Sequence, residues 1–589
     1  MTQLKLSGFF SVRIGPLFQA ILIPLFIYFY LVSLPNVYAQ DSSADRSSIP
    51  SSEQATVLGK KAEEEQEEEL ERRRQAPEIT VQAKEPEPET REDIHFFVRE
   101  IHVKGSIIIP KTTLDSMTAA YENKELTLSE INQLTKAITE KYHQKGFQTS
   151  FAYLPPQQVR DGKLSIVVVE GKVGDIWTEG NRFFRKRKII SYLPLRQGEI
   201  LNVKKIQLAL KRLNDNLKRE VSALITAGKK PGTTDIILKV KDRFPAHADF
   251  SFDNQGIDSS GELRYGFTVT DYNFSSLDDV ASVGTIFGKH FGFIFTQYQI
   301  PLPLSDTNLV MGFNHGQSNP VKDLKPLGVN SRSETYTSGI EHTFFRGDHI
   351  TMDLSGGFEI REGRTLLEAR TYTRERLRIL RFAPKIVAFS SQSATAFTNE
   401  FRFGIDSLGA AIHADSAVSR QGVEPSFFIF KGKLHHFQKM PLDTKAMVQI
   451  EFQHPSRKLP SQEALYLGGG STVRGYPEGD YLADSGFRVT VEYLLPFLFF
   501  PKDLQLPRST TPLRKQVEMV AFVDEAYGRL RGPSDSEAGL RHLTGVGGGL
   551  RIRLYQHLFA RIEWGIAVGD HPLRAGNRHE FNFRLQAET

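Results

Sequence analysis

The chain has 589 residues, of which 40% are hydrophobic and 24% charged, and its mean hydropathy is −0.32. This composition excludes a protein that crosses a membrane with several helices, but it is compatible with a membrane barrel, in which only alternate residues face lipid. The net charge of +5 is small for this length and gives no reason to expect nucleic-acid binding. The absence of cysteine excludes disulfides and thiolate chemistry and suits a chain that passes through an oxidising compartment.

Residues 1–39 have the pattern of a secretory signal peptide. Lys5 and Arg13 supply positive charge before an apolar run over Ala20–Leu34, and Ala39 ends a Val-Tyr-Ala sequence that suits cleavage. The alternative is a single membrane-anchoring helix, for which the apolar run is short. We therefore expect cleavage after Ala39, and we expect any later membrane crossing to be made by strands.

The segment 40–75 is polar and changes character along its length. It begins rich in Ser and Asp, as disordered chains do, and continues over Glu53–Gln75 with strong helix formers. Glu68 precedes Arg72 by four residues, a spacing that supports a helix. A helix that is polar all round cannot pack against a core, so a solvated charged linker remains an alternative. Residues 76–92 carry several prolines among charges and predict a stiff, extended linker.

Two copies of one small unit follow, over 93–172 and 173–243. The sequence Ile-His-Val-Lys-Gly that begins at Ile101 matches Ile-Trp-Thr-Glu-Gly beginning at Ile176, and apolar residues further along match at the same offset. Each copy shows a strand, then apolar residues at helical spacing, then two strands. The repeat therefore predicts two α+β domains in a row.

The region 244–589 alternates between polar and apolar residues. Arg551 and Ile552, for example, begin an alternating run, and charge on one face with apolar residues on the other fits a wall between lipid and a polar lumen. The last alternating strand, Phe581–Leu585, lacks the terminal aromatic residue typical of barrel-insertion signals. We expect Gln586–Thr589 to trail beyond that strand.

The stretch Leu467–Tyr476, reading LGGGSTVRGY, is the most unusual part of this region. Gly468, Gly469 and Gly470 can adopt positive φ and let other parts of the chain approach closely. Such a run predicts a loop that folds against something, because it would make a poor strand. Arg474 follows it, and an enclosed guanidinium needs a carboxylate or several acceptors. Taken alone, however, the stretch is equally typical of a solvated hairpin loop with an exposed arginine.

Val473–Tyr476, reading Val-Arg-Gly-Tyr, resembles the lumen-loop signature of two-partner secretion outer-membrane transporters of the haemolysin secretion/activation type. Phe522 and Asp524 resemble the family's Phe-x-Asp-x-Gly motif on the inner barrel wall, with Ala526 in place of the glycine. The resemblance implies that the loop folds into the lumen and that Arg474 meets Asp524. Because a barrel lumen holds water, we expect that contact to be partly solvated. The residues that the resemblance marks are Gly468, Gly469, Gly470, Val473, Arg474, Gly475, Tyr476, Phe522 and Asp524.

The order and spacing of these features agree with the family across most of the chain. The resemblance implies a mainly β protein with a 16-stranded transmembrane barrel at 244–589, which leaves ~22 residues for each strand and its connection. It also implies two periplasmic POTRA domains, which bind unfolded clients at a sheet edge or in a groove, and an N-terminal helix that plugs the pore. The implied partners are a large secreted β-helical exoprotein, outer-membrane lipid and the machinery that inserts barrels.

The sequence contains no convincing catalytic or metal-binding pattern. Gly469–Val473 resembles a nucleophile elbow but has valine where the second glycine must stand. His435 and His436 are adjacent, so on a strand they would point to opposite faces. We therefore expect a transporter without a cofactor, and not an enzyme. The alternatives are a factor that inserts other barrels, in which a longer POTRA array is usual, and a passive porin or adhesin, in which the repeated pair would be unexplained.

Overall fold

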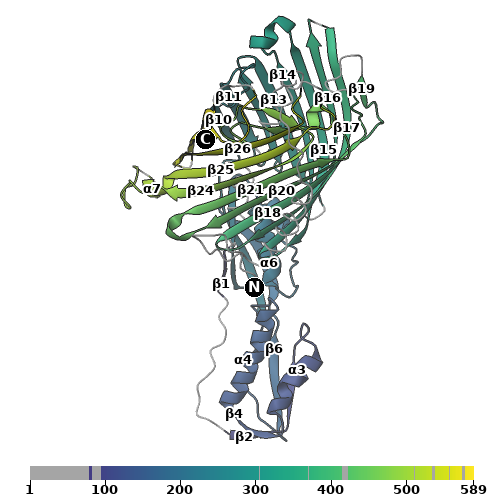
Figure 1. Ribbon diagram of the computed structural model, residues 1–589. Helices are drawn as coiled ribbons and strands as arrows, with labels where there is room; N and C mark the ends of the chain where they lie inside the picture. The colour runs from purple at the N-terminus through teal and green to yellow at the C-terminus, as the bar shows by residue number, and fades with distance from the viewer. Residues whose placement is uncertain are drawn as a thin grey trace.

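The structure is a computed structural model. It describes residues 78–82, 95–303, 306–368, 370–413, 422–507, 509, 511–533, 537–555, 557–573 and 578–589. The expected signal peptide and the polar segment with its plug helix lie outside these residues, as does most of the expected linker. Among the helices described, none is both long and apolar enough to cross a membrane. Figure 1 shows two small domains in a row that lead to a wide barrel.

The domain farthest from the barrel is built from the first repeat (Figure 1). Its elements are β2 (His95–Val98), β3 (Glu100–Lys104), α3 (Lys111–Thr118), η1 (Ala119–Tyr121), β4 (Lys124–Thr127), α4 (Leu128–Gln144), β5 (Phe151–Tyr153) and β6 (Lys163–Val169). The sheet has the order β3-β6-β5, and β2 pairs with β4 beside it. A capping box of Thr127 and Glu130 begins α4, whose Ile131, Leu134 and Ile138 are buried in the core with sheet residues.

The second repeat forms a domain between the first domain and the barrel (Figure 1). Its elements are β7 (Lys172–Glu179), α5 (Lys186–Ser191), α6 (Val203–Leu213), β8 (Arg219–Ala227) and β9 (Thr233–Asp242). The sheet has the order β1-β8-β9-β7, and its edge strand β1 (Ile79–Val81) comes from the expected linker. Here Ile79 pairs with Ala223 in parallel, and the Gln82 amide donates to the Ile225 carbonyl at 2.8 Å. Sequence analysis missed this strand, whose Ile-Thr-Val sequence is β-branched and free of proline.

Sixteen antiparallel strands of the described chain form a closed ring, because β10 pairs with β28. They are β10 (Ala246–Asp253), β11 (Arg264–Asp271), β12 (Val280–Gly288), β13 (Phe291–Pro301), β14 (Thr307–Ser318), β15 (Asn330–Arg346), β16 (Ile350–Leu367), β17 (Arg370–Phe389), β18 (Ser393–Gly404), β20 (Phe427–Lys439), β21 (Lys445–Pro455), β24 (Ser485–Pro496), β25 (Val517–Arg529), β26 (Leu540–Leu554), β27 (Leu558–Ala567) and β28 (His579–Glu588). The short β19 (Ala411–His413) pairs with the outer part of β17. Connections hold η2 (Lys322–Leu327), η3 (Pro441–Asp443) and α7 (Leu513–Gln516). The predicted 16-stranded barrel is thus confirmed.

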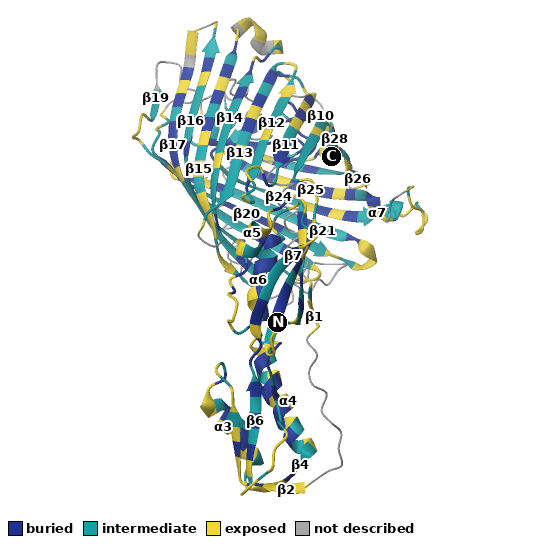
Figure 2. Cartoon of the chain, turned by 180° about the vertical axis from the view of Figure 1, so that it is seen from behind, coloured by how far each residue is buried: buried dark blue, intermediate teal, exposed yellow. Residues whose placement is uncertain are grey.

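Exposed and buried residues alternate along the barrel strands (Figure 2). On β17, Leu380, Phe382 and Ile386 are exposed, whereas Ile379, next to Leu380, is buried on the inner face. The expectation that Gln586–Thr589 trails beyond the last strand is wrong. Gln586–Glu588 continue β28 and its pairing with β10, and the Thr589 amide donates to the Ala248 carbonyl, because the ring can close only if both edge strands find a partner.

The second domain is fixed to the near end of the barrel, which the resemblance implies is periplasmic, through Asp278 in the turn between β11 and β12. Both terminal nitrogens of Arg219 donate to its carboxylate, at 2.8 and 2.7 Å, and Asn216 Nδ2 donates at 2.8 Å. The Tyr192 hydroxyl donates to the same carboxylate, and burial together with the Asp278 charge raises the pKa of Tyr192. The Arg219 and Asp278 side chains are 0% and 5% exposed, so this is a buried ion pair.

Helix α6 adds two ion pairs to the same junction. Lys211 Nζ lies 2.7 Å from Asp348, and Arg212 Nη2 lies 2.5 Å from Asp306, both in periplasmic turns of the barrel. A cavity of 1420 Å³ lies between helices α5 and α6 of the second domain and the barrel strands. The second domain therefore stands against the barrel mouth without filling it.

We expect Asp278→Ala to loosen the second domain from the barrel, because the substitution leaves Arg219 buried without its carboxylate. Breaking such a pair costs roughly 3–5 kcal/mol. Hydrogen exchange of the amides in α5 and at the start of β8 should accelerate, while the barrel strands stay protected.

The matched control is Asp175→Ala, which removes an exposed ion pair with Lys229 in the same domain. Such surface pairs contribute about 0–1 kcal/mol, so exchange should change little. Equal exchange in the two variants would contradict the proposed docking through Asp278.

Candidate functional site

The connection between β21 and β24, residues 456–484, folds into the barrel, and we call it the inner loop. It contains η4 (Ser461–Glu463), β22 (Leu465–Leu467) and β23 (Tyr481–Ala483), and the two strands pair as a short hairpin. From Leu459 to Asp484 every residue is buried or half-buried. The alternative of a solvated surface hairpin is therefore excluded.

The glycine run shapes the turn that follows the β22 strand. Gly468 and Gly469 have φ of +99° and +105°, values that side chains other than glycine rarely adopt. The Gly470 amide donates to Glu478 at 2.9 Å, which ties the two sides of the turn together. The turn presents Arg474 to the barrel wall.

Arg474 is brought together with Asp524 of β25, as the resemblance implied. Its Nε and Nη2 donate to the two carboxylate oxygens at 2.7 Å each, and its backbone amide donates at 3.0 Å. The guanidinium carbon lies 3.5 Å from the centre of the Phe522 ring. A bidentate pair with an aromatic face beneath it fixes both the position and the plane of the guanidinium.

Two further carboxylates hold the same arginine, and sequence reasoning missed both. Arg474 Nη1 donates to Glu492 of β24 at 2.6 Å and to Glu563 of β27 at 3.2 Å. Arg551 pairs with Glu492 at 2.5 Å, and Arg561 pairs with Glu563 at 2.7 Å. Three arginines therefore balance three carboxylates, counting Asp524. The alternation of these charged residues with apolar neighbours predicts that they lie on the inner face. That they meet at Arg474 could not be predicted, because it depends on how the strands pair.

The expectation that lumen water reaches this contact is wrong. Arg474 is 2% exposed and Asp524 0%, because the loop covers the wall on which the carboxylates stand. An arginine that cannot lose its proton is tolerated there because each of its outer nitrogens meets a carboxylate.

The rest of the motif packs around the arginine. Gly475 has φ +98°, and a Cβ there would meet Ala567 backbone at 2.6 Å, so only glycine allows this approach to β27. The Tyr476 hydroxyl donates to the Asp570 carbonyl at 2.8 Å. Val473 and Ala526 are fully buried in one apolar cluster with Tyr476. Alanine at the position of the family's glycine thus adds a methyl group to this cluster without disturbing the register of β25.

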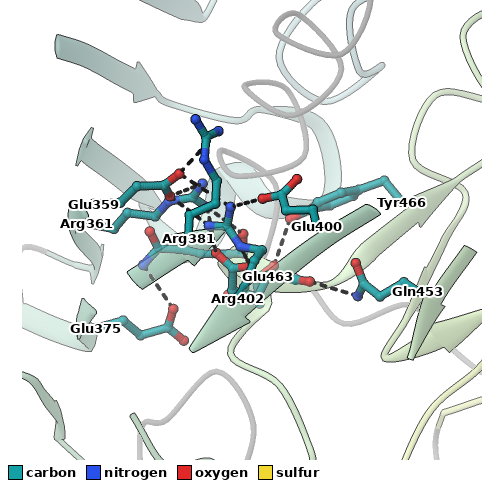
Figure 3. Close-up of polar contacts among 11 residues, drawn as sticks. Glu359, Arg361, Glu375, Arg381, Glu400, Arg402, Gln453, Glu463 and Tyr466 are labelled. Carbon is teal, nitrogen blue, oxygen red and sulfur yellow. Dashed lines mark hydrogen bonds and ion pairs between the residues drawn. The ribbon is translucent and has the colours of Figure 1, made fainter. Parts of the chain in front are cut away.

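The inner loop also meets a second part of the wall, through Glu463 (Figure 3). Arg402 of β18 donates through Nε and Nη2 to its two carboxylate oxygens, at 2.9 and 3.0 Å. Arg361 Nη1 of β16 lies 2.9 Å from the same carboxylate. Arg402 also pairs with Glu359 and Glu400, at 2.7 and 2.6 Å, and Glu463 is 2% exposed. The loop is therefore fixed to the wall by two buried charge clusters. The loop contributes a positive charge, Arg474, to the first and a negative charge, Glu463, to the second.

A further buried carboxylate, that of Asp484, binds backbone amides where the inner loop meets the barrel strands. Asp484 is fully buried, and it accepts from the Leu459 amide at 2.9 Å and from the Arg531 amide at 2.7 Å. Among the residues that the structure describes, no group of three or more His, Asp or Glu side chains is arranged to hold a metal ion. The carboxylates around the loop instead bind arginines and backbone amides.

Comparison with known families matches both parts of the chain. Residues 96–171 match the description POTRA domain, ShlB-type. Residues 232–552 match Haemolysin secretion/activation protein ShlB/FhaC/HecB, which covers more than half of the chain.

Individual proteins agree with this assignment. Outer membrane transporter CdiB of Dickeya dadantii is 26% identical over 399 residues, 65% of this chain and 69% of that protein. Heme/hemopexin transporter protein HuxB of Haemophilus influenzae is 21% identical over 380 residues, 63% and 67% of the two chains. Among solved structures, CdiB from Escherichia coli has a TM-score of 0.71 at 20% identity, covering 94% of this chain and 100% of that one. CdiB from Acinetobacter baumannii has a TM-score of 0.65 at 16% identity, covering 92% and 99%. The chain belongs to the ShlB/FhaC/HecB family of haemolysin secretion/activation proteins, outer-membrane transporters that secrete partner exoproteins.

Proposed function

We propose that this transporter receives one large β-helical exoprotein, still unfolded, in the periplasm and passes it through the barrel, with the inner loop as the element that must be positioned for passage. The observation that carries this proposal is the buried bidentate pair of Arg474 and Asp524 inside the barrel. The loop fills the lumen and is held by these buried ion pairs together with an apolar cluster that it shares with the wall, so its displacement as a unit requires the pairs to exchange.

Client capture is assigned to the two periplasmic domains. Phe97, Ile107 and Phe183 expose 53%, 76% and 38% of their surface, and such apolar groups suit an unfolded chain. In the described part of the chain, the short edge strand β5 pairs on one side only. An extended client can add to such an edge through backbone hydrogen bonds. The exposed basic side chains of Arg182, Arg185, Lys186 and Arg187 add attraction for acidic segments.

The cavity at the junction supports a route from these domains to the lumen. Its lining is shared by Lys188, Gln207 and Asn214 of the second domain and by barrel residues such as Thr270 and Gln297. The lining mixes these polar side chains with apolar ones such as Leu217, Pro301 and Phe389, which suits passage of a client of mixed composition. The polar helix proposed for Glu53–Gln75, outside the described residues, would occupy the lumen in the resting state. Barrel-assembly machinery would insert the transporter into the outer-membrane lipid.

Arg474→Ala should strongly reduce secretion while the amount of transporter in the outer membrane stays near normal. The loop loses its bidentate hydrogen bond to Asp524, but the pairing of the barrel strands is kept. The substitution also leaves three buried carboxylates facing two arginines, at a cost of roughly 3–5 kcal/mol. The measurement is exoprotein in the medium, normalised to folded transporter in the outer membrane. The cargo to test first is a large, repeat-rich exoprotein encoded in an adjacent gene.

The double variant Arg474→Ala/Asp524→Ala restores the charge balance of the cluster. It should be no worse than either single variant in secretion, since all three break one contact, and it should resist heat better than Arg474→Ala. Arg474→Lys keeps the charge but should rescue secretion poorly, because an ammonium group cannot form the bidentate hydrogen bond. Additive secretion defects would show that the two residues act separately, and normal secretion by Arg474→Ala would show that the loop is a bystander.

Glu463→Gln should weaken the contact of the inner loop with Arg402 and Arg361, on a different part of the wall from Asp524. A hydrogen bond to a charged group contributes ~1.5–3 kcal/mol, and Arg402 retains Glu359 and Glu400, so the barrel should stay folded. We expect protease cleavage within 456–484 to become faster and secretion to fall partially. The matched control is Glu424→Gln, which removes an exposed ion pair with Arg457 at the start of the same loop. Identical cleavage rates for the two variants would contradict a second anchor at Glu463.

A further inference from the structure

The extracellular end of three long neighbouring strands carries an unusual row of arginines on its outer face. The turn between β15 and β16 lies at the periplasmic end, since Asp348 in that turn pairs with Lys211 of the second domain. The opposite ends of β15, β16 and β17, around residues 366–371, therefore lie at the extracellular end of the barrel (Figure 1).

The direction of each side chain follows from the Glu463 cluster. Arg361 of β16 and Glu375 of β17 contact the inner loop, and Glu359 of β16 pairs with Arg361, so all three point inward (Figure 3). Because side chains alternate along a strand, Arg364 of β16 and Arg374 of β17 point outward.

The strand register places three of these outward arginines side by side. Arg332 of β15 pairs with Arg364 of β16, and Arg364 pairs with Arg374 of β17. All three are exposed. We call this set the arginine row. Like charges directly opposite each other on paired strands repel, so the row destabilises the sheet unless an anion lies across it.

The nearest carboxylates are engaged elsewhere. Glu334 lies 3.4 Å from His315, and Glu362 lies 3.3 Å from Arg378. Within the described residues, no carboxylate lies within 4.0 Å of a nitrogen of the arginine row. The side-chain hydrogen bonds from the row in that part of the chain are two, from Nε and Nη2 of Arg364 to the Thr371 hydroxyl, at 3.2 and 2.7 Å.

An apolar band lies below the row on the same outer face, beyond the level of Glu334 and Glu362. Tyr336, Ile340, Leu380 and Phe382 are 46%, 50%, 48% and 45% exposed, as lipid-facing side chains are. Arg332 and Tyr336 are separated by four residues along β15, which corresponds to ~13 Å along the strand and ~9 Å along the membrane normal for a strand tilted by about 45°. The arginine row therefore lies at the level of the lipid headgroups, above the acyl chains that contact the apolar band.

We propose that the arginine row binds the phosphate groups of the phosphorylated glycolipid of the outer leaflet, with its acyl chains on the apolar band below. Guanidinium groups bind phosphate through paired N–H donors, and one phosphate across two arginines also relieves their repulsion. The row lies on the outer face, continuous with lipid-facing side chains and outside the lumen, which favours a lipid over an acidic segment of the cargo. Bound glycolipid would hold the long β15–β17 hairpins upright beside the exit of the lumen.

The test uses the full transporter, purified in detergent with EDTA so that divalent cations do not bridge phosphates. The probe is bisphosphorylated lipid A, and its binding is measured by native mass spectrometry and titration. We expect R364Q/R374Q to weaken binding at least about tenfold, since each lost charged hydrogen bond contributes ~1.5–3 kcal/mol and 1.4 kcal/mol is a factor of ten. Wild-type binding should fall similarly when the lipid is dephosphorylated, and it should weaken with salt.

The matched control is K289Q/R529Q, which removes two exposed positive charges at the extracellular end away from the row. It should bind lipid A as the wild type does. Unchanged gel mobility before heating shows that each variant keeps a folded barrel.

Equal loss of lipid A binding in both double variants would overturn the proposal, because only net charge would matter. Equal affinity for phosphorylated and dephosphorylated lipid would also overturn it, as would binding of inorganic phosphate with no preference for the lipid. Competition by unfolded exoprotein at the row, without lipid binding, would assign the row to the cargo instead.

Discussion

The pairing of β10 with β28 is the constraint on which the rest of this structure depends. In lipid, every backbone amide and carbonyl needs a partner within the protein, and only a closed ring of strands provides one for each. Closure explains why the strand at the end of the sequence continues through Glu588, and why the two faces of each strand differ. The outer face meets acyl chains, and the inner face is left free to carry charge.

The inner face uses that freedom to hold a loop. Arg474 is surrounded by carboxylates of β24, β25 and β27, whereas Glu463 is surrounded by arginines of β16 and β18. The loop therefore carries one charge of each sign into the wall, and each meets a cluster of the opposite sign. Both clusters are buried with the loop in place, and apolar residues of the loop pack against the wall beside them. This arrangement gives the loop one defined position, and leaving it requires the ion pairs to exchange.

Charge also organises the two ends of the barrel. At the periplasmic end, Asp278 receives Arg219, Asn216 and Tyr192 from the second domain, so this domain is held at the mouth in a fixed orientation. At the extracellular end, the arginine row stands just above the apolar band. The same residue type thus has three environments along the barrel. It is buried in ion pairs at the lumen and the junction, and exposed where phosphates of the outer leaflet lie.

The sequence by itself determined the architecture. Alternation over 244–589, the repeat of two α+β units and the glycine-rich loop were all readable, because they depend on local periodicity and on backbone freedom. The contact of Arg474 with Asp524 was readable only through resemblance to a family. Tertiary structure alone decided the rest. Glu492 and Glu563 reach Arg474, and Arg402 reaches Glu463, because strand pairing brings together residues that lie far apart in the chain. The strand at Ile79–Val81 and the row of Arg332, Arg364 and Arg374 likewise exist only through pairing. Periodicity tells which face a side chain occupies, but the register between strands decides which side chain stands beside it.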